Sequence, residues 1–329
     1  MKRRLFALAL VLTLALFAFV LTACNDEPPS AVQDKIPNLT ILYEQDSDML
    51  NTYSMIAVSP DAPFNNQSGA AVKINTSGAD AFINWMSLAS TRELIKNYGY
   101  STYGDYLFYL LEDAPTVDVT IPNATAETKV IRLSTTTSVN DSGLMDYLVP
   151  VFENTYGYDV QIYSAGTGAA INAAKAGNAD LILVHSKSQE EAFVNAGFGR
   201  VVSGFDKERV SFMYNFFVLV GPTTDPAGVK EAPSVKDAFN LIAEGGYKFI
   251  SRGDGSGTHT KELTLWPKNL GITSDIDGTD PLVEDSMTYE WYVSAGQGMG
   301  ACLMMANEKN AYVLSDKATY LAFKNFVEK

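Results

Sequence analysis

The sequence predicts an α/β fold in which parallel sheets are covered by helices. Short apolar segments of strand length alternate with segments of helix length from residue 129 onward. Glycines follow several of the helical segments, as is common at helix C-termini. The 329 residues are 47% hydrophobic, which is enough for large buried cores and excludes wholesale disorder. A chain of this length corresponds to roughly two domains.

The expected elements divide the chain into two unequal parts. The segment 39–113 holds two strands and few helices, and it would be only marginally stable alone. Polar, proline-rich stretches at 25–38 and 114–128 flank it, and the first indicates a flexible tether. Beyond residue 129, a helix is expected to begin near Ser142, and Ser234 is placed to cap another helix. The expected strands are 39–43, 53–58, 130–134, 159–163, 180–184, 216–220 and 247–251, and the expected helices are 79–86, 92–97, 142–152, 169–176, 190–196, 234–244 and 258–266.

The N-terminus has the pattern of a secretory signal. Three basic residues at 2–4 precede an apolar run at 5–21 and the small residues before Cys24. The run is short for an uncleaved membrane anchor, which needs about 20 residues. Leu21-Thr22-Ala23-Cys24 resembles the lipobox of bacterial lipoproteins. That resemblance implies a signal peptide at 1–23, diacylglycerol on Cys24, a tether at 24–38, and attachment to the outer face of a bacterial membrane.

The charge excludes several function classes. The net charge is −14, and the first 23 residues hold three positive charges and no negative ones, so the rest of the chain carries −17. A surface this acidic argues against nucleic-acid binding and against a polybasic membrane contact. Two distant cysteines exclude a disulfide scaffold, and two histidines exclude a histidine-rich metal site. We expect no metal and no cofactor, and we expect Cys302 to be a small buried residue.

Three loops share the chemistry of an anion site. Each places hydroxyl groups and glycines between the carboxyl end of a strand and the start of a helix. Open α/β sheets bind ligands at this position, where unpaired N–H groups and the helix dipole favour negative charge. Arg252 is the one residue in these loops with a full positive charge, and its planar guanidinium can donate to two oxygens of one ligand. The loops are Thr135-Thr136-Thr137-Ser138, Ser164-Ala165-Gly166-Thr167-Gly168 and Arg252-Gly253-Asp254-Gly255-Ser256-Gly257-Thr258.

Other interpretations of these loops stay open. Serine and threonine before a helix are also ordinary N-caps. Ser256 lies close in sequence to His259 and Asp254, as it would in a secreted serine-dependent hydrolase, but closeness in a loop does not make a triad. His185 follows a buried strand and is expected to be a structural or hinge-side residue. We expect a binding protein rather than an enzyme, with no catalytic residues.

Five strings of the sequence resemble the tungstate-binding lipoproteins of ABC importers. The resemblance covers residues 129 to about 325, and the strings occur in the order of the family. It implies the type II periplasmic-binding-protein fold, in which two lobes, each a sheet covered by helices, close on the oxyanion. The strings are STTTSVNDSGLMDYLVPVFE, SAGTGAAINAAKAGNADLILVHS, MYNFFVLVGPTTDPAG, FISRGDGSGTHTKELTLW and WYVSAGQGMGACLMMANEKNAYVLSDKATYLAF.

The order of the chain departs from the family. The strings LTILYEQDSDMLNTYSMIAVSP and GADAFINWMSLASTRELIKNYGYSTYGDYLFY, within 39–109, look like the family's C-terminal part placed at the front. We therefore expect a circular permutation in which 114–128 joins the usual C-terminus to the usual N-terminus; domain termini are commonly close together, so the rearrangement is tolerable. A separate N-terminal domain is the alternative. The expected lobe one is about 59–113 plus 129–212, and the expected lobe two is about 39–55 plus 213–329.

The resemblance implies nine candidate oxyanion contacts. Arg252 and Thr258 stand where the family motif Ser-Arg-Gly-Asp-x-Ser-Gly-Thr places direct contacts from lobe two. Arg252 is the candidate for neutralising the ligand and for favouring tungstate over molybdate. The nine are Thr136, Thr137, Ser138, Thr167, Gly168, Arg252, Ser256, Gly257 and Thr258.

The expected function is capture of tungstate, with molybdate as a second ligand, and its delivery to an ABC permease by a monomer whose lobes close. Tungstate is fully deprotonated at neutral pH and needs donors only, whereas phosphate benefits from an acceptor such as Asp254. We expect Asp254 to orient Arg252 or to cap the next helix. A carboxylate directed at the ligand would favour a phosphate-binding protein of an ABC importer instead.

Overall fold

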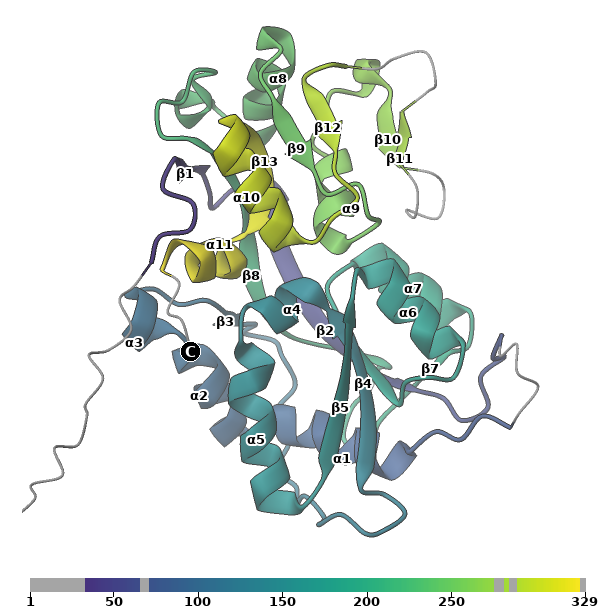
Figure 1. Ribbon diagram of the computed structural model, residues 1–329. Coiled ribbons are helices and arrows are strands. Elements are labelled where there is room, and N and C mark those ends of the chain that lie inside the picture. Colours follow the sequence, from purple (N-terminus) through teal and green to yellow (C-terminus); the bar gives the residue numbers. More distant parts are fainter. Residues whose placement is uncertain (1–32, 66–70, 275–280, 284–288, 326–329) are drawn as a thin grey trace, which may run out of the picture.

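The computed structural model describes residues 33–65, 71–274, 281–283 and 289–325, and these form two lobes joined by long strands (Figure 1). The expected signal segment and Cys24 lie outside the described residues. Within the described ranges, no helix has the length and apolar character that crossing a membrane requires. The helices are α1 (Thr76–Met86), α2 (Ala89–Asn97), α3 (Tyr100–Tyr103), α4 (Thr137–Asp141), α5 (Leu144–Tyr156), α6 (Thr167–Lys175), α7 (Lys187–Asn195), α8 (Val235–Gly245), α9 (Gly257–Leu263), α10 (Met299–Lys309) and α11 (Lys317–Lys324), with 3-10 turns η1 (Ser47–Met49), η2 (Val229–Glu231) and η3 (Lys268–Leu270).

One sheet runs through both lobes. Its strands are β1 (Leu39–Tyr43), β2 (Leu50–Val58), β3 (Tyr109–Leu110), β4 (Val130–Thr136), β5 (Asp159–Ala165), β6 (Leu181–Val184), β7 (Gly199–Arg200), β8 (Arg209–Pro222), β9 (Phe249–Ser251), β12 (Tyr292–Ser294) and β13 (Tyr312–Asp316). The order is β12-β9-β13-β8-β2-β6-β4-β5, while β1 and β3 pair with β8 and β7 pairs with β2. The strands β10 (Ile272–Ser274) and β11 (Pro281–Val283) form a separate pair.

The sheet is mixed, so the expectation of parallel sheets is correct only for its two ends. In lobe one β4 pairs in parallel with β5 and β6, and in lobe two β9 pairs in parallel with β12 and β13. In the middle, β2 is antiparallel to β6 and β8, and β8 is antiparallel to β13. The middle differs because β2 and β8 run between the lobes in opposite directions.

These two middle strands connect the lobes. The first half of β8 pairs with β2, from Arg209 opposite Ile56 to Phe216 opposite Leu50. From Phe217 onward β8 pairs with β13, and its last residues pair with β1. The strand is therefore one continuous element that belongs to lobe one at its start and to lobe two at its end.

Helices cover both faces of the sheet in each lobe. Along β2, Met55 and Ala57 face the core beneath α1, α2 and α5, while Ile56 and Val58 face the core beneath α6 and α7. The same period of two occurs along β8, where Leu219 packs toward α8 and Val218 toward α10. Strands buried on both faces form continuous apolar runs in the sequence, as β6 and the second half of β8 do.

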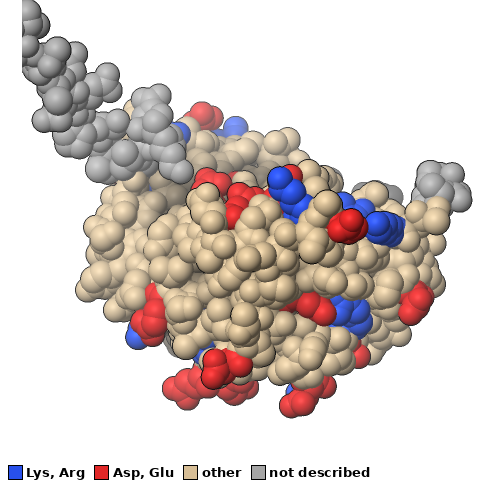
Figure 2. All heavy atoms as spheres, turned by 90° about the horizontal axis from the view of Figure 1, so that it is seen from below, with Lys and Arg blue, Asp and Glu red and all other residues tan. Residues whose placement is uncertain are grey.

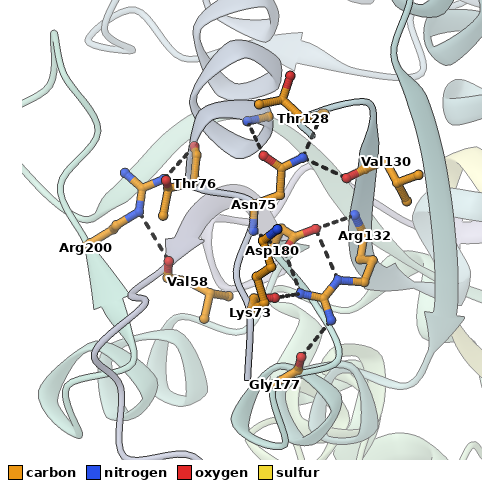
Figure 3. A network of polar contacts seen from close by, with 11 residues as sticks. Val58, Lys73, Asn75, Thr76, Thr128, Val130, Arg132, Gly177, Asp180 and Arg200 are labelled. Carbon is orange, nitrogen blue, oxygen red and sulfur yellow. Dashed lines mark hydrogen bonds and ion pairs between the residues drawn. The ribbon is translucent and has the colours of Figure 1, made fainter. Parts of the chain in front are cut away.

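Residues that precede 114 are built into the same lobe as residues that follow 128. Figure 3 shows the network that joins them around Asp180, which is fully buried. The Asp180 carboxylate accepts hydrogen bonds from the backbone N–H of Asn75 (2.8 Å) and from the backbone and guanidinium of Arg132 (2.7, 3.2 and 2.6 Å). The Asn75 amide in turn donates to the carbonyls of Thr128 and Val130, each at 2.7 Å.

Part of the expected tether is packed. Ile36 is completely buried, and the backbone N–H of Lys35 donates to the Phe323 carbonyl at 3.1 Å. The Lys324 ammonium lies 2.7 Å from the Asp34 carboxylate. Residues 33–38 thus belong to lobe two, beside the end of α11. The stretch 114–128 forms no regular helix or strand and lies against lobe one, where Ile121 is buried in the core.

Candidate functional site

The three expected anion loops meet where the lobes face each other. They follow the carboxyl ends of β4, β5 and β9 and lead into α4, α6 and α9, as the sequence predicts. The helix expected to begin near Ser142 is α5, which begins at Leu144, and a short helix that was not expected, α4, precedes it from Thr137. The strand β4 keeps its pairing with β5 as far as Thr136, opposite Ala165, so the strand leads directly into α4.

Two hydrogen bonds cross from one lobe to the other at this point. The Arg252 guanidinium donates through Nη2 to the hydroxyl of Thr137 at 3.2 Å. The backbone N–H of Gly257 donates to the hydroxyl of Thr167, also at 3.2 Å. The structure therefore brings the three loops together through four of the candidate residues.

Most of the nine candidates are shielded from solvent. Thr137 and Gly168 are half-buried, and Gly168 lies in the first turn of α6 beside Thr167. The others are buried: Thr136, Ser138, Thr167, Arg252, Ser256, Gly257 and Thr258.

Arg252 is a buried charge with an unused donor. It is 2% exposed, and its Nη2 forms an ion pair with Asp254 at 2.6 Å. Within the part of the chain that the structure describes, its Nε–H has no hydrogen-bond partner, and the hydroxyl of Thr258 in the same loop has none either. A buried donor without a partner costs about 1–3 kcal/mol, so these groups are expected to serve a ligand.

The Asp254 carboxylate is occupied inside its own loop. One oxygen accepts from Arg252, and the other accepts from the backbone N–H of Ser256 at 3.1 Å. The expectation that Asp254 orients Arg252 is confirmed. The hydroxyl of Ser256 caps α9 by accepting from the backbone N–H of His259 at 3.2 Å.

The pair Ser256 and His259 does not form a catalytic arrangement. The Nδ1 atom of His259 accepts from the backbone N–H of Gly255 at 3.0 Å, and its Nε2 atom has no partner among the described residues. The contact between the two residues runs through the His259 backbone, so the imidazole is not placed to take a proton from the serine.

Sequence reasoning missed a polar chain behind the first loop. The Ser138 hydroxyl lies 3.1 Å from that of Thr136 and 2.9 Å from Nε2 of His185. The Nδ1 atom of His185 lies 2.7 Å from Oδ1, the side-chain amide oxygen of Asn51. Burial, followed by the nearby charge of Arg252, lowers the pKa of His185 to about 3. The signal in the sequence was a polar residue near the start of the buried strand β2 and another directly after the buried strand β6.

Other titratable groups near the loops are also shifted by burial. Burial raises the pKa of Glu262 to about 7, and its Oε1 accepts from Trp266 Nε1 (3.0 Å) and Tyr292 Oη (2.8 Å). Cys302 is buried as expected, and burial raises the pKa of its thiol to about 12. Among the described residues, no group of three or more histidine, cysteine, aspartate or glutamate residues could hold a metal ion.

A groove of about 1320 Å³ opens between the lobes beside this site. Asn51 and His185 line it from lobe one and the connecting strand, and Gly257, Thr260 and Lys261 line it from lobe two. The groove therefore reaches the side of the site at which the two lobes meet.

Comparisons with known proteins agree on one family. The sequence model described as a PBP superfamily domain matches residues 123–329. A tungstate-binding protein TupA from Peptoclostridium acidaminophilum is 47% identical over 59% of this chain and 61% of its own length. A tungstate-binding protein TupA from Campylobacter jejuni is 34% identical over 57% of this chain and 62% of its own length. The chain thus spans about three-fifths of these curated relatives.

Among solved structures, the tungstate ABC transporter from Geobacter sulfurreducens is 43% identical over 62% of this chain and 79% of its own, with a TM-score of 0.49.

Proposed function

Because this chain belongs to the PBP superfamily, we propose that it is an extracytoplasmic solute-binding protein that captures tungstate between its lobes and delivers it to an ABC permease. The names of the relatives support the choice of ligand, since two of them are tungstate-binding proteins. We further propose that Cys24 carries the lipid anchor on the outer face of the membrane, and that the protein acts as a monomer.

The observation that carries the proposal is the buried guanidinium of Arg252. A buried cation is costly unless its charge and its N–H groups are paired. Asp254 pairs one end of the group, and the free Nε–H remains, together with the Thr258 hydroxyl. An oxyanion bound beside them would satisfy both donors. The nine candidate residues remain our proposed lining of the ligand site, where a residue contacts the anion through its side chain, contacts it through its backbone N–H, or supports a neighbour that does.

The state of Asp254 favours tungstate over phosphate. Both carboxylate oxygens are already hydrogen-bonded to donors of their own loop, so neither is committed to accepting a ligand proton. A site that offers donors suits a fully deprotonated dianion. Molybdate has the same charge and nearly the same size, and we propose it as a second ligand.

Closure of the lobes is the proposed mechanism of capture. The bonds from Arg252 to Thr137 and from Gly257 to Thr167 join lobe two to lobe one at the site. Closing would remove water from around the anion, which strengthens every charge-assisted hydrogen bond to it. The closed shape is what we propose the permease recognises.

The distribution of surface charge fits a small anionic ligand better than a nucleic acid. Figure 2 shows the face of lobe one that points away from lobe two, where acidic and basic side chains are scattered among uncharged ones without a broad basic area. With a net charge of −14, long-range attraction does not collect the anion, so close donors must bind it.

Calorimetric titration of residues 25–329 with tungstate, molybdate, sulfate and phosphate at neutral pH tests the proposal. Tight one-to-one binding of tungstate, weaker or similar binding of molybdate, and no binding of phosphate would support it. Tight phosphate binding would assign the protein to phosphate uptake. If none of the four anions gave a heat of binding, an oxyanion-binding role would be contradicted.

One observation favours hydrolysis as a second candidate. Ser138, His185 and Asn51 are arranged like a nucleophile, a base and an orienting group. However, a histidine whose pKa is about 3 is a weak general base at neutral pH. Turnover of p-nitrophenyl esters that disappears in Ser138→Ala would favour the hydrolase, and no turnover would reject it.

We also propose that the chain is circularly permuted, with lobe one at about 59–113 plus 129–212 and lobe two at about 39–55 plus 213–329. The bonds from Lys35 to Phe323 and from Asp34 to Lys324 place both ends of the described chain side by side. A chain in which 325 is joined to 33 and opened within 114–128 should therefore fold and bind the anion. A variant lacking 39–113 that still folds and binds would contradict the permutation.

A further inference from the structure

The imidazole of His185 lies between the strand that joins the lobes and the first anion loop. It is 7% exposed, and the rings of Tyr53 and Phe217 lie 4.9 and 6.2 Å from it, centroid to centroid. Its two nitrogen atoms contact Asn51 on β2 and Ser138 at the start of α4. The ring thus connects the strand that links the lobes to the loop that faces the ligand.

The hydrogen bonds of Asn51 fix the direction of this connection. Its Nδ2 donates to Tyr53 Oη at 2.9 Å and to Asn215 Oδ1 at 2.8 Å. The remaining oxygen, Oδ1, faces His185 and can only accept. Nδ1 of His185 must therefore carry the ring hydrogen. The ring is neutral at neutral pH because burial lowers its pKa, so Nε2 is an acceptor.

This tautomer decides where the hydroxyl hydrogens of the loop point. Since Nε2 of His185 accepts, the Ser138 hydroxyl donates its only hydrogen to it. The Thr136 hydroxyl, 3.1 Å away, must then donate to Ser138. Thr137 differs, because its oxygen accepts from Arg252 and its own hydrogen stays free.

We propose that His185 is a positioning residue of the anion loop: as the Nδ1–H tautomer it ties Ser138 to Asn51 and turns the hydroxyl hydrogens of Thr136 and Ser138 away from the ligand. The inference rests on the proposed function and refines it, since it distinguishes among the candidate contacts. In this loop the Thr137 hydroxyl and backbone N–H groups serve the anion, while the Thr136 and Ser138 hydroxyls hold the loop in shape.

Nitrogen NMR of the imidazole rings tests the tautomer directly. The chain has two histidines, and a His259→Gln variant leaves one to be assigned. At pH 7 we expect His185 to be protonated at Nδ1 and bare at Nε2, both before and after tungstate is added. A ring protonated at Nε2, or a charged imidazolium, would overturn the proposal. This result does not depend on whether tungstate binds, which the titration of the unmodified protein decides separately.

A matched pair of isosteric variants tests the functional consequence. Thr136→Val and Thr137→Val each replace one hydroxyl by a methyl group in the same loop. We expect Thr137→Val to weaken tungstate binding at least about tenfold, and Thr136→Val by less than about threefold. Equal losses, or a larger loss in Thr136→Val, would overturn the assignment.

Variants of His185 itself complete the test. His185→Phe removes both hydrogen bonds and should weaken tungstate binding at least about tenfold. A cooperative unfolding transition would show that this variant is still folded. In His185→Gln the amide oxygen can still accept from Ser138, so most of the affinity should return. A folded His185→Phe that binds as tightly as the unmodified protein would overturn the positioning role. If His185→Phe fails to fold, the comparison of Thr136→Val with Thr137→Val and the NMR measurement of the tautomer still test the proposal.

Discussion

Gly257 of lobe two lies directly against the imidazole of His185 in lobe one. A β-carbon at Gly257 would stand 2.7 Å from Cε1 and 2.9 Å from Nδ1 of that ring, closer than carbon and nitrogen atoms approach in proteins. The ring cannot easily move aside, because Asn51 and Ser138 hold it from both sides. The absence of a side chain at Gly257 is therefore a condition for the lobes to close.

Gly257→Ala should consequently hinder closure rather than folding. The clash lies between lobes and is relieved when they separate, so each lobe can keep its own core. We expect tungstate affinity to fall at least about tenfold, equivalent to about 1.4 kcal/mol, with little change in the unfolding temperature. Calorimetry measures the affinity. At saturating tungstate, small-angle scattering should show a larger radius of gyration for Gly257→Ala than for the unmodified protein.

Gly298→Ala is the matched control for this prediction. Gly298 precedes α10 with an ordinary φ of −64°, and nothing lies within 4 Å of its added β-carbon. It should bind tungstate like the unmodified protein. Unchanged affinity in Gly257→Ala would show that the lobes do not close as described.

Arg252→Lys should weaken tungstate binding about 10- to 100-fold. Lysine keeps the positive charge but lacks the planar guanidinium. It therefore loses the contacts with Thr137 and Asp254 and the unpaired Nε–H that is proposed to bind the anion. The measurement is the dissociation constant by calorimetry. Arg92→Lys, on α2 and outside the three loops, is the control and should bind normally. If both variants bind alike, Arg252 is not a ligand contact.

Glu262 should make stability fall as pH rises from about 5 to 8. Its folded-state pKa is raised to about 7, so between the unfolded value and pH 7 the native state holds a proton that the unfolded chain releases. The native state is thus penalised at pH 8 by up to about 3 kcal/mol. Glu262→Gln removes the penalty while its oxygen can still accept from Trp266 and Tyr292.

Urea denaturation at the two pH values measures this effect. Glu262→Gln should match the unmodified protein near pH 5 and exceed it at pH 8. Parallel stability curves for the two proteins would mean that Glu262 does not titrate in this range.

Asp180→Ala should destabilise lobe one by about 3–5 kcal/mol. The substitution leaves the Arg132 guanidinium without its buried partner and removes the acceptor for the Asn75 backbone. Glu191→Ala, which breaks an exposed ion pair with Lys187, should cost only about 0–1 kcal/mol. Chemical denaturation measures the free energy of unfolding of both variants. A similar small loss in Asp180→Ala and Glu191→Ala would reject the stabilising role given to the network in Figure 3.

Local sequence patterns predict most of the strands and helices correctly. The apolar runs of β1, β6 and β9 and the cap of α8 by Ser234 were readable because each depends on neighbouring residues. The antiparallel middle of the sheet was not, because the pairing of β2 with β8 joins residues more than 150 positions apart. The short helix α4 was not predicted, because Val139 is the single apolar residue among its five residues and no helical periodicity can be read from it.

The candidate site shows the same division. Arg252 and the three loops were found because glycine, serine and threonine between strands and helices form a local pattern. The contact between His185 and Asn51 could not be found in this way, since 134 positions separate them and only the pairing of β2 with β6 brings them together.

The most direct test of the account is anomalous diffraction at a tungsten absorption edge from crystals grown with tungstate. We predict one strong peak between the lobes, with the anion's oxygens within hydrogen-bond distance of Arg252 Nε, Thr258 Oγ1 and Thr137 Oγ1. A peak elsewhere on the molecule, or none between the lobes, would contradict the proposed site.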